Sequence, residues 1–551
     1  MLTRARATPW EINTAELTRQ VLDYARGLGL DTISCGGGFG EVPDAFRAQY
    51  PDARYLEMNW EGWTQKHYLD PSDPLFRKLQ VAFLRAFNAR YGTCHIYNYD
   101  PYPEMAARVS DEEKVQLKYA FARAISGIIR EADPEGQWYL SGWAFTYPDW
   151  PPETVKAFLD LIPNDRFYLA DVWAEVPPAE DRSWALRAPV YVPNEHFYGK
   201  NWLFGILHTF GKRKLLYGDA AELIQRLQEG ARSEAWSRCR GIYTNPESIC
   251  HNIFYFTLAS DLGWDPGRVA LESFTDAYTR TRYGEAAYPA MRQALDRIVR
   301  ATQGADTVRM IACYWTRPFE YVRFLSGPEH QREAAARGER IAQIREAIDL
   351  ALTARAVEEG NPLYENDLVA WYRQLMSEIY NREIHAAYEA FCAGDTAGLD
   401  MAADKALAAM RSIEDVLAHA PDYRMSDIVA QARRLPGSDS APANFPDAPS
   451  DLDLVGVIKA DHTYLNDYAA TDLWELLALY YRPRVEAYVR TLETRLRRGK
   501  TAVSQTELAA AYDRLRAQWM AAHLAGPPEQ RPVLDIIQQH LRGMAEEEDS
   551  S

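Results

Sequence analysis

Two glutamates, Glu104 and Glu247, each follow a stretch that predicts a short β-strand, and each comes directly after a proline. Proline restricts the backbone just before the carboxyl group. Two carboxyl groups that meet at one rim of a sheet can cleave a glycosidic bond. One protonates the leaving oxygen, and the other attacks the anomeric carbon or activates water. The rival interpretation is that each glutamate lies at the N-terminus of a helix and interacts with its dipole. Residue type and spacing leave both interpretations open.

Other polar and aromatic residues follow strand-like stretches in the same way: Asp100, Trp143, Asp171, Glu175, His208 and Asn245. Six strand-then-helix units succeed one another in the first half of the chain, which predicts a parallel sheet with helices packed outside it. The helices are expected at 14–28 with Thr14 as N-cap, 74–91, 111–131, 153–162, 219–234 and 248–261. In a (β/α)₈ barrel, the strand-end residues would share the carboxyl-terminal rim, where chemistry takes place.

A doubly wound open sheet would also alternate strands and helices, and it is the alternative fold. The chain has no G-x-G-x-x-G or P-loop spacing, and its strands are apolar on both faces, as strands inside a barrel are. Both features favour a TIM-like barrel. A closed barrel of this kind needs eight strands, so six units predict an incomplete barrel. The missing units are most easily placed upstream of Met1.

From about residue 269 the strand patterns cease, and helical patterns follow at 283–302, 331–358, 364–392, 397–419, 466–498 and 505–523. The predicted fold class is therefore α/β plus all-α. A partial catalytic barrel at 1–268 is followed by an α-helical domain at 269–551.

Composition narrows the classes of partner. The net charge is −17, from 61 basic and 78 acidic residues, and such a surface repels nucleic acid. Fifteen Trp and 33 Tyr permit a carbohydrate-binding role, because aromatic rings stack on sugars, although most such rings fill cores. No apolar run is long enough to span a membrane. The first residues lack a signal-peptide core, so the expected compartment is the cytoplasm if Met1 is the true start.

Several short segments, in the same order along the chain, match those of one enzyme family. They are Trp60-Glu61-Gly62, Leu69 to Phe76, His95-Ile96-Tyr97 with Asp100 and Glu104, Trp138 with Gly142-Trp143, Leu207-His208 with Phe210-Gly211, Pro246-Glu247, Arg282-Tyr283-Gly284, and Asp467-Tyr468 with Tyr480 to Arg484. With these segments the chain resembles the α-N-acetylglucosaminidase family, glycoside hydrolase family 89.

The resemblance implies a retaining exo-glycoside hydrolase that removes terminal α-linked N-acetylglucosamine and needs no metal or other cofactor. Glu104 would be the general acid/base and Glu247 the nucleophile, with their carboxyl groups ~5–5.5 Å apart. Trp60 and Trp143 would pack against the sugar, and Tyr468 would close the pocket from the helical half; packing between domains is the other interpretation of these three rings. Asp100 and His208 would orient the site or support it.

Two departures from the family pattern bear on activity. Pro103 stands where the family has an asparagine whose amide contacts the sugar, so specificity at the 2-position can differ. The family's N-terminal domain and first two barrel units have no counterpart here. A second chain or a missing N-terminal segment could complete the barrel. The alternatives are a truncated fragment and a non-catalytic carbohydrate-binding pseudoenzyme. Uncovered strand edges would leave the chain alone poorly soluble or inactive.

Overall fold

The structure is a computed structural model. It describes residues 7–36, 40–60, 63–102, 104–176, 188–208, 216–247, 252–304, 314, 318, 328–437, 472–503, 505–521 and 528–550. Two compact units make up the chain. The first comprises Met1–His208, Arg226–Asn245 and Gly263–Gly267, and the second comprises Thr209–Gln225, Pro246–Leu262 and Arg268–Ser551.

The first unit contains a parallel sheet of six strands in the order β1-β4-β6-β7-β8-β9. The strands are β1 (Ile33–Cys35), β4 (Ile96–Asn98), β6 (Gln137–Leu140), β7 (Phe167–Asp171), β8 (Asn201–Ile206) and β9 (Cys239–Thr244). The strand order follows the chain, as it does in a barrel rather than in a doubly wound sheet. The six predicted strands and the TIM-like α/β class are confirmed. Within the described residues the sheet does not close, and β1 and β9 are its edges.

The sheet is strongly curved. Tyr139 in β6 and Tyr243 in β9 have ring centroids 5.8 Å apart, although two strands, β7 and β8, separate them in the sheet. Strands three places apart in a flat sheet would be roughly 14 Å from one another. The two rings therefore meet across a concave face, as inward-pointing side chains of a barrel do.

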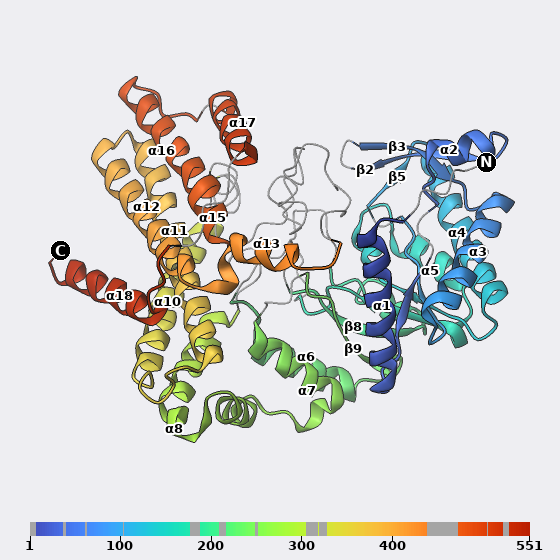
Figure 1. The fold of residues 1–551 in the computed structure, drawn as a ribbon, viewed down its shortest axis with the longest axis horizontal. Coiled ribbons are helices and arrows are strands. Elements are labelled where there is room, and N and C mark those ends of the chain that lie inside the picture. Colours follow the sequence, from blue (N-terminus) through green and yellow to red (C-terminus); the bar gives the residue numbers. More distant parts are fainter. Residues whose placement is uncertain are drawn as a thin grey trace. The chain divides into compact units, whose positions relative to one another are not determined.

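Helices alternate with the sheet strands along the chain, and two of those in the first unit begin at side-chain caps. The helices that follow the sheet strands are α2 (Asp44–Gln49), α3 (Pro74–Tyr91), α4 (Asp111–Ala132), α5 (Pro152–Asp160), α6 (Ala220–Arg232) and α7 (Ile253–Trp264). Asp73 accepts a hydrogen bond from Leu75 N at 2.8 Å and caps α3, and Ser110 forms a capping box with Glu113 at the start of α4. Helix α4 packs between α3 and α5 (Figure 1). The predicted bounds of α3 are confirmed to the residue.

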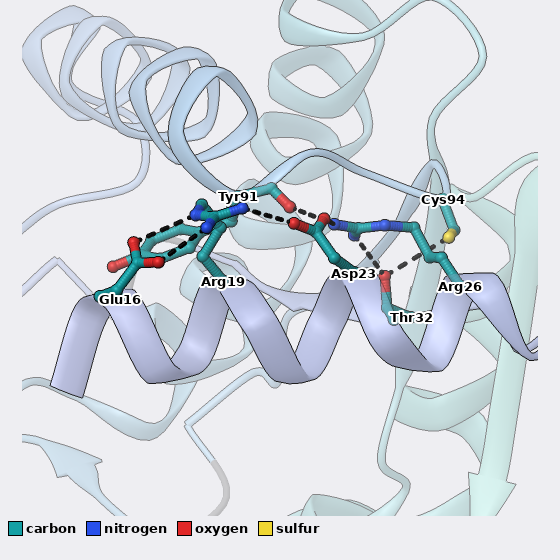
Figure 2. A network of polar contacts seen from close by, with 7 residues as sticks. All are labelled: Glu16, Arg19, Asp23, Arg26, Thr32, Tyr91 and Cys94. Atoms are coloured by element: carbon teal, nitrogen blue, oxygen red, sulfur yellow. Dashed lines mark hydrogen bonds and ion pairs between the residues drawn. The ribbon is translucent and has the colours of Figure 1, made fainter. Parts of the chain in front are cut away.

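Helix α1 (Pro9–Gly27) begins earlier than predicted. Its cap is Thr8, which forms a capping box with Glu11, so the prediction of Thr14 as N-cap is wrong. Figure 2 shows how the charged side of α1 is attached to the unit. Arg19 bridges Glu16 and Asp23, and Arg26 donates to the carbonyl oxygen of Tyr91 at 2.6 Å and to Thr32 at 3.2 Å.

A second, antiparallel sheet was not predicted from the sequence. Its order is β3-β2-β5, with β2 (Tyr55–Trp60), β3 (Trp63–Leu69) and β5 (Ala106–Ala107). The pairing of Asn59 with Ala106 brings the end of β2 to the loop that follows β4. This small sheet therefore places Trp60 beside the segment that carries Glu104.

The second unit is helical, as predicted. Its helices are α8 (Leu271–Thr302), α10 (Pro328–Leu352), α11 (Pro362–Ala393), α12 (Thr396–Ala418), α13 (Met425–Arg433), α15 (Trp474–Leu476), α16 (Arg482–Arg497), α17 (Gln505–Ala521) and α18 (Val533–Ser550), with a π-helical segment at Leu477–Tyr481. Helices α11 and α12 lie side by side around a shared apolar core (Figure 1). Helices α13 and α18 were not predicted. Across the described residues, no helix combines the length and the apolar character needed to cross a lipid bilayer.

Candidate active site at the strand ends

The site residues of the first unit lie just beyond the carboxyl ends of its strands. Asp100 and Glu104 follow β4, Trp143 opens a 3₁₀ turn (Trp143–Thr146) after β6, Asp171 ends β7, and His208 follows β8. The carboxyl ends of parallel strands share one edge, so the sheet gathers these residues, as the sequence predicted.

Two indoles hold the carboxyl group of Glu104. Trp60 Nε1 donates to Oε2 at 3.0 Å, and Trp143 Nε1 donates to Oε1 at 2.9 Å. Glu104 is exposed, whereas both tryptophans are half-buried. The carboxyl group is thus open to a ligand while each of its oxygens has a fixed N–H partner. The structure brings together these three residues, which lie as much as 83 positions apart in the sequence.

Asp100 is half-buried. Its Oδ1 accepts a hydrogen bond from Ser141 N at 2.7 Å, which ties the loop after β4 to the end of β6. Burial of the carboxyl group raises the pKa of Asp100, and the bond from Ser141 partly offsets this. These contacts give Asp100 a supporting position next to the loop of Glu104.

Asp171 and Glu175, at the end of β7, are buried acids. Tyr191 N donates to Asp171 Oδ2 at 2.8 Å, and burial raises the pKa of Asp171 to about 7. Glu175 Oε1 accepts from His208 N at 2.6 Å, and burial raises its pKa to about 8. A Cβ at Gly205 in β8 would lie 1.8 Å from the carbonyl oxygen of Asp171, so only glycine permits this close approach of the strands.

His208 is fully buried, and its backbone has a φ of 67°, which is uncommon for a residue other than glycine. The bond from its amide to Glu175 holds the chain in this left-handed conformation. The structure therefore gives His208 a supporting place at the end of β8. The sequence predicted Glu175 at this rim, but only the structure shows that its carboxyl group accepts from the backbone amide of His208, just after β8.

Two further predicted residues are not placed relative to Glu104. Glu247 is half-buried and lies three residues beyond the end of β9, and it belongs to the second unit. Tyr468 lies outside the described residues, as does Pro103.

Several motifs that suggested the family serve the scaffold. Asp70 is buried, and its Oδ1 accepts from Ser72 N at 2.7 Å, just before the cap of α3. In the second unit, Arg282 forms a two-pronged ion pair with Asp367 at 2.6 and 2.9 Å, and Tyr283 donates to the same carboxyl group. Gly284, with a φ of 76°, interrupts α8 directly after these two residues.

No group of three or more His, Cys, Asp or Glu side chains converges as a possible metal site in the part of the chain that the structure describes. The strand-end rim presents carboxyl groups and aromatic rings. An exposed carboxyl group with two N–H partners can hold or transfer a proton at a bound substrate.

Comparison with known proteins gives a consistent result. Residues 5–266 match the description "Alpha-N-acetylglucosaminidase (NAGLU) tim-barrel domain", and residues 274–540 match the C-terminal domain of the same family. The human alpha-N-acetylglucosaminidase is 27% identical over 499 residues, which cover 89% of this chain and 64% of that protein.

Solved structures show the same fold. A family 89 glycoside hydrolase from Clostridium perfringens, bound to 2-acetamido-1,2-dideoxynojirmycin, has a TM-score of 0.72 at 17% identity over 97% of this chain and 59% of that one. A structure of the Clostridium perfringens enzyme with its substrate GlcNAc-alpha-1,4-galactose has a TM-score of 0.70 at 17% identity, over 96% of this chain and 58% of that one. The chain thus spans less than two thirds of the length of these relatives. It belongs to the alpha-N-acetylglucosaminidase family, glycoside hydrolase family 89.

Proposed function

We propose that this chain is the catalytic part of a retaining exo-glycoside hydrolase that removes terminal α-linked N-acetylglucosamine. The observation that carries the proposal is the exposed carboxyl group of Glu104, held by two indole N–H groups at the strand-end rim. The substrate class is supported by the name of the human relative and by the GlcNAc-alpha-1,4-galactose bound to the Clostridium enzyme.

In this proposal Glu104 is the general acid/base and Glu247 the nucleophile. Glu104 protonates the glycosidic oxygen while Glu247 attacks the anomeric carbon, which gives a covalent glycosyl-enzyme and a free alcohol. Glu104 then takes a proton from water, and the resulting hydroxide displaces Glu247 from the sugar. The second inversion restores the α configuration. Trp60, Trp143 and Tyr468 would contact the sugar, and Asp100 and His208 would keep the rim in place.

The stereochemistry of the product tests the mechanism. Proton NMR of the first product from an aryl α-N-acetylglucosaminide should show the α anomer before mutarotation, and Glu247→Ala should abolish turnover. Glu135→Gln, which lies just before the amino end of β6, is the matched control and should retain activity. A β anomer, or equal turnover by wild type and Glu247→Ala, would reject the assignment. Saturable sugar binding without turnover would favour the non-catalytic alternative.

We also propose that two further parallel strand–helix units complete the sheet between β9 and β1. The six described strands leave both edges open, and an eight-stranded barrel would need two more. Ile33 in the edge strand β1 is 47% exposed. Helix α1 and its end carry a row of exposed apolar side chains at helical spacing, namely Leu17, Val21, Tyr24 and Leu28.

Hydrogen exchange tests the completion of the barrel. The probe is the part of the human relative that this chain does not match, co-expressed with the 551-residue chain. Backbone amides of β1 and β9 should exchange fast in the chain alone and slowly in the complex, whereas β7 should be protected in both. Unchanged exchange at both edges, or a complex formed only between two copies of this chain, would contradict the proposal.

A further inference from the structure

The three residues of the Glu104 cluster come from independent segments. Trp60 ends β2 of the antiparallel sheet, Trp143 opens the 3₁₀ turn after β6, and Glu104 lies in the loop after β4. Each indole N–H donates to a different carboxyl oxygen, at 3.0 and 2.9 Å. Two donors on two oxygens fix the rotation of the carboxyl group about its last bond, which a single donor would not do.

Both donors are themselves fixed. The pairing of Asn59 with Ala106 anchors the end of β2 next to the loop of Glu104. The turn of Trp143 is closed by Thr146 Oγ1, which donates to the carbonyl oxygen of Trp143 at 2.7 Å, and Tyr147 packs edge-on against its ring. The N–H groups are therefore held in place before any ligand arrives, which is what preorganisation requires.

Contact with a sugar would not by itself require tryptophan at these two positions. A sugar ring stacks on the face of any aromatic side chain, so phenylalanine could serve there. An indole has in addition one N–H donor and no acceptor, and both tryptophans point this donor at the same carboxyl group.

We propose that Trp60 and Trp143 are positioning residues that aim the carboxyl group of Glu104 at the glycosidic oxygen through their N–H groups. This inference rests on the proposed function and assigns these two residues a role beyond sugar contact. Correct aim matters most when the leaving group is a poor one, because such a group needs the proton in the transition state.

The first experiment needs no turnover. The indole N–H signals of the nitrogen-15-labelled chain are assigned to Trp60 and Trp143 through the Trp60→Phe and Trp143→Phe variants. Glu104→Gln keeps one acceptor oxygen and replaces the other with an NH₂ group, so one of the two indoles loses its acceptor. We expect the signal of that indole to shift and the signal of Trp264, which is 91% exposed, to stay in place. If neither Trp60 nor Trp143 shifts, the proposed contacts are wrong.

The second experiment separates positioning from sugar contact. kcat/KM is measured for aryl α-N-acetylglucosaminides that differ only in their leaving group. The double variant Trp60→Phe, Trp143→Phe keeps both aromatic faces and loses both N–H groups. It should lose about 30- to 100-fold for the phenyl glycoside, since two hydrogen bonds to the carboxyl group are removed, and less than about 3-fold for the 2,4-dinitrophenyl glycoside. The matched control Trp264→Phe should be unchanged for both substrates.

Each outcome points to one conclusion. An equal loss for both leaving groups would mean that the two tryptophans act through sugar binding, and the positioning role would be wrong. No loss for either would reject any role of the N–H groups in the reaction. A wild-type chain that turns over neither glycoside, even when co-expressed with its barrel-completing probe, would overturn the proposed function and with it the positioning role, whereas the NMR shifts alone would still report the contacts.

Discussion

Glu104 and Glu175 are the same type of residue, and both follow strands of one parallel sheet, yet the fold uses them differently. Glu104 is exposed and accepts from two side chains, whereas Glu175 is 6% exposed and accepts from the backbone of His208. A carboxyl group that a ligand can reach can do chemistry. A buried one that holds a backbone amide fixes the chain. Solvent access and type of donor therefore distinguish the two glutamates.

The surroundings of Asp171 extend the comparison. Both Asp171 and Glu175 sit where burial raises the pKa, to about 7 and about 8, so folding favours their protonated forms. Raised pKa values often mark catalytic acids. Here the geometry assigns these two acids to the scaffold, because both accept from backbone amides: Asp171 from Tyr191, between β7 and β8, and Glu175 from His208, just after β8.

The largest expected difference between the two glutamates is in activity. Glu104→Gln should lower kcat/KM for the phenyl glycoside by about 10³-fold, because it removes the acid, while leaving the melting temperature near that of wild type. Glu175→Gln, a substitution of the same size and charge change, should retain activity within about tenfold. Both kcat/KM and thermal melting are measured on the same preparations. Comparable activity losses in the two variants would contradict a catalytic role for Glu104 alone.

The next effect concerns the pH dependence of stability. Between its usual pKa of 4.5 and its folded pKa of about 8, Glu175 keeps a proton in the folded state that the unfolded chain has lost. The free energy of unfolding should therefore fall as the pH rises through this window, by on the order of 4 kcal/mol, and level off above it.

Asp171 acts in the same direction between its usual 3.8 and about 7. Urea unfolding at pH 5, 6, 7 and 8 measures the slope, and Glu175→Gln should flatten it. A stability that rises with pH across this window in wild type, or a slope unaffected by Glu175→Gln, would contradict the buried, protonated state of Glu175.

A smaller effect is expected from the loss of the hydrogen-bond acceptor at Glu175. Glu175→Ala removes the carboxyl oxygen that accepts from the His208 amide and opens a cavity, which should lower the free energy of unfolding by about 1–3 kcal/mol more than Glu175→Gln does. Glutamine retains an acceptor oxygen and is the matched control. Urea unfolding at a fixed pH compares the two variants. Equal stabilities would show that the bond to His208 contributes little.

The smallest effect is expected for Asp100. This residue lies in the same loop as Glu104 but accepts from a backbone amide, as Glu175 does. Asp100→Asn keeps one acceptor oxygen for Ser141 N and removes a carboxyl group whose pKa burial raises. We expect a change of less than about 1 kcal/mol in stability, and a loss of activity below about tenfold. A loss of activity as large as that of Glu104→Gln would show that Asp100 takes part in the reaction itself.

Local patterns were enough to predict the elements that form the sheet and most of its helices. The six strands, the bounds of α3 and the helical second half follow from short-range periodicity, capping residues and proline positions, which act over a few residues. The hairpin of β2 and β3 was missed, because the stretch before the helix at 74–91 was not recognised as paired strands. Thr14 was taken for the cap of α1 because the capping box of Thr8 and Glu11 lies further upstream.

The sequence by itself determined that acidic and aromatic residues follow the strands of a parallel sheet, since strand positions depend on local pattern. Only the tertiary structure decided which acid is exposed and which is buried, and that Trp60 and Trp143 donate to Glu104. Those properties depend on how segments tens of residues apart pack and on how strongly the sheet curves, as the rings of Tyr139 and Tyr243 show. Spacing along a chain carries no measure of distance across a fold, so two glutamates that both follow strands come to differ in exposure and in hydrogen-bond donors.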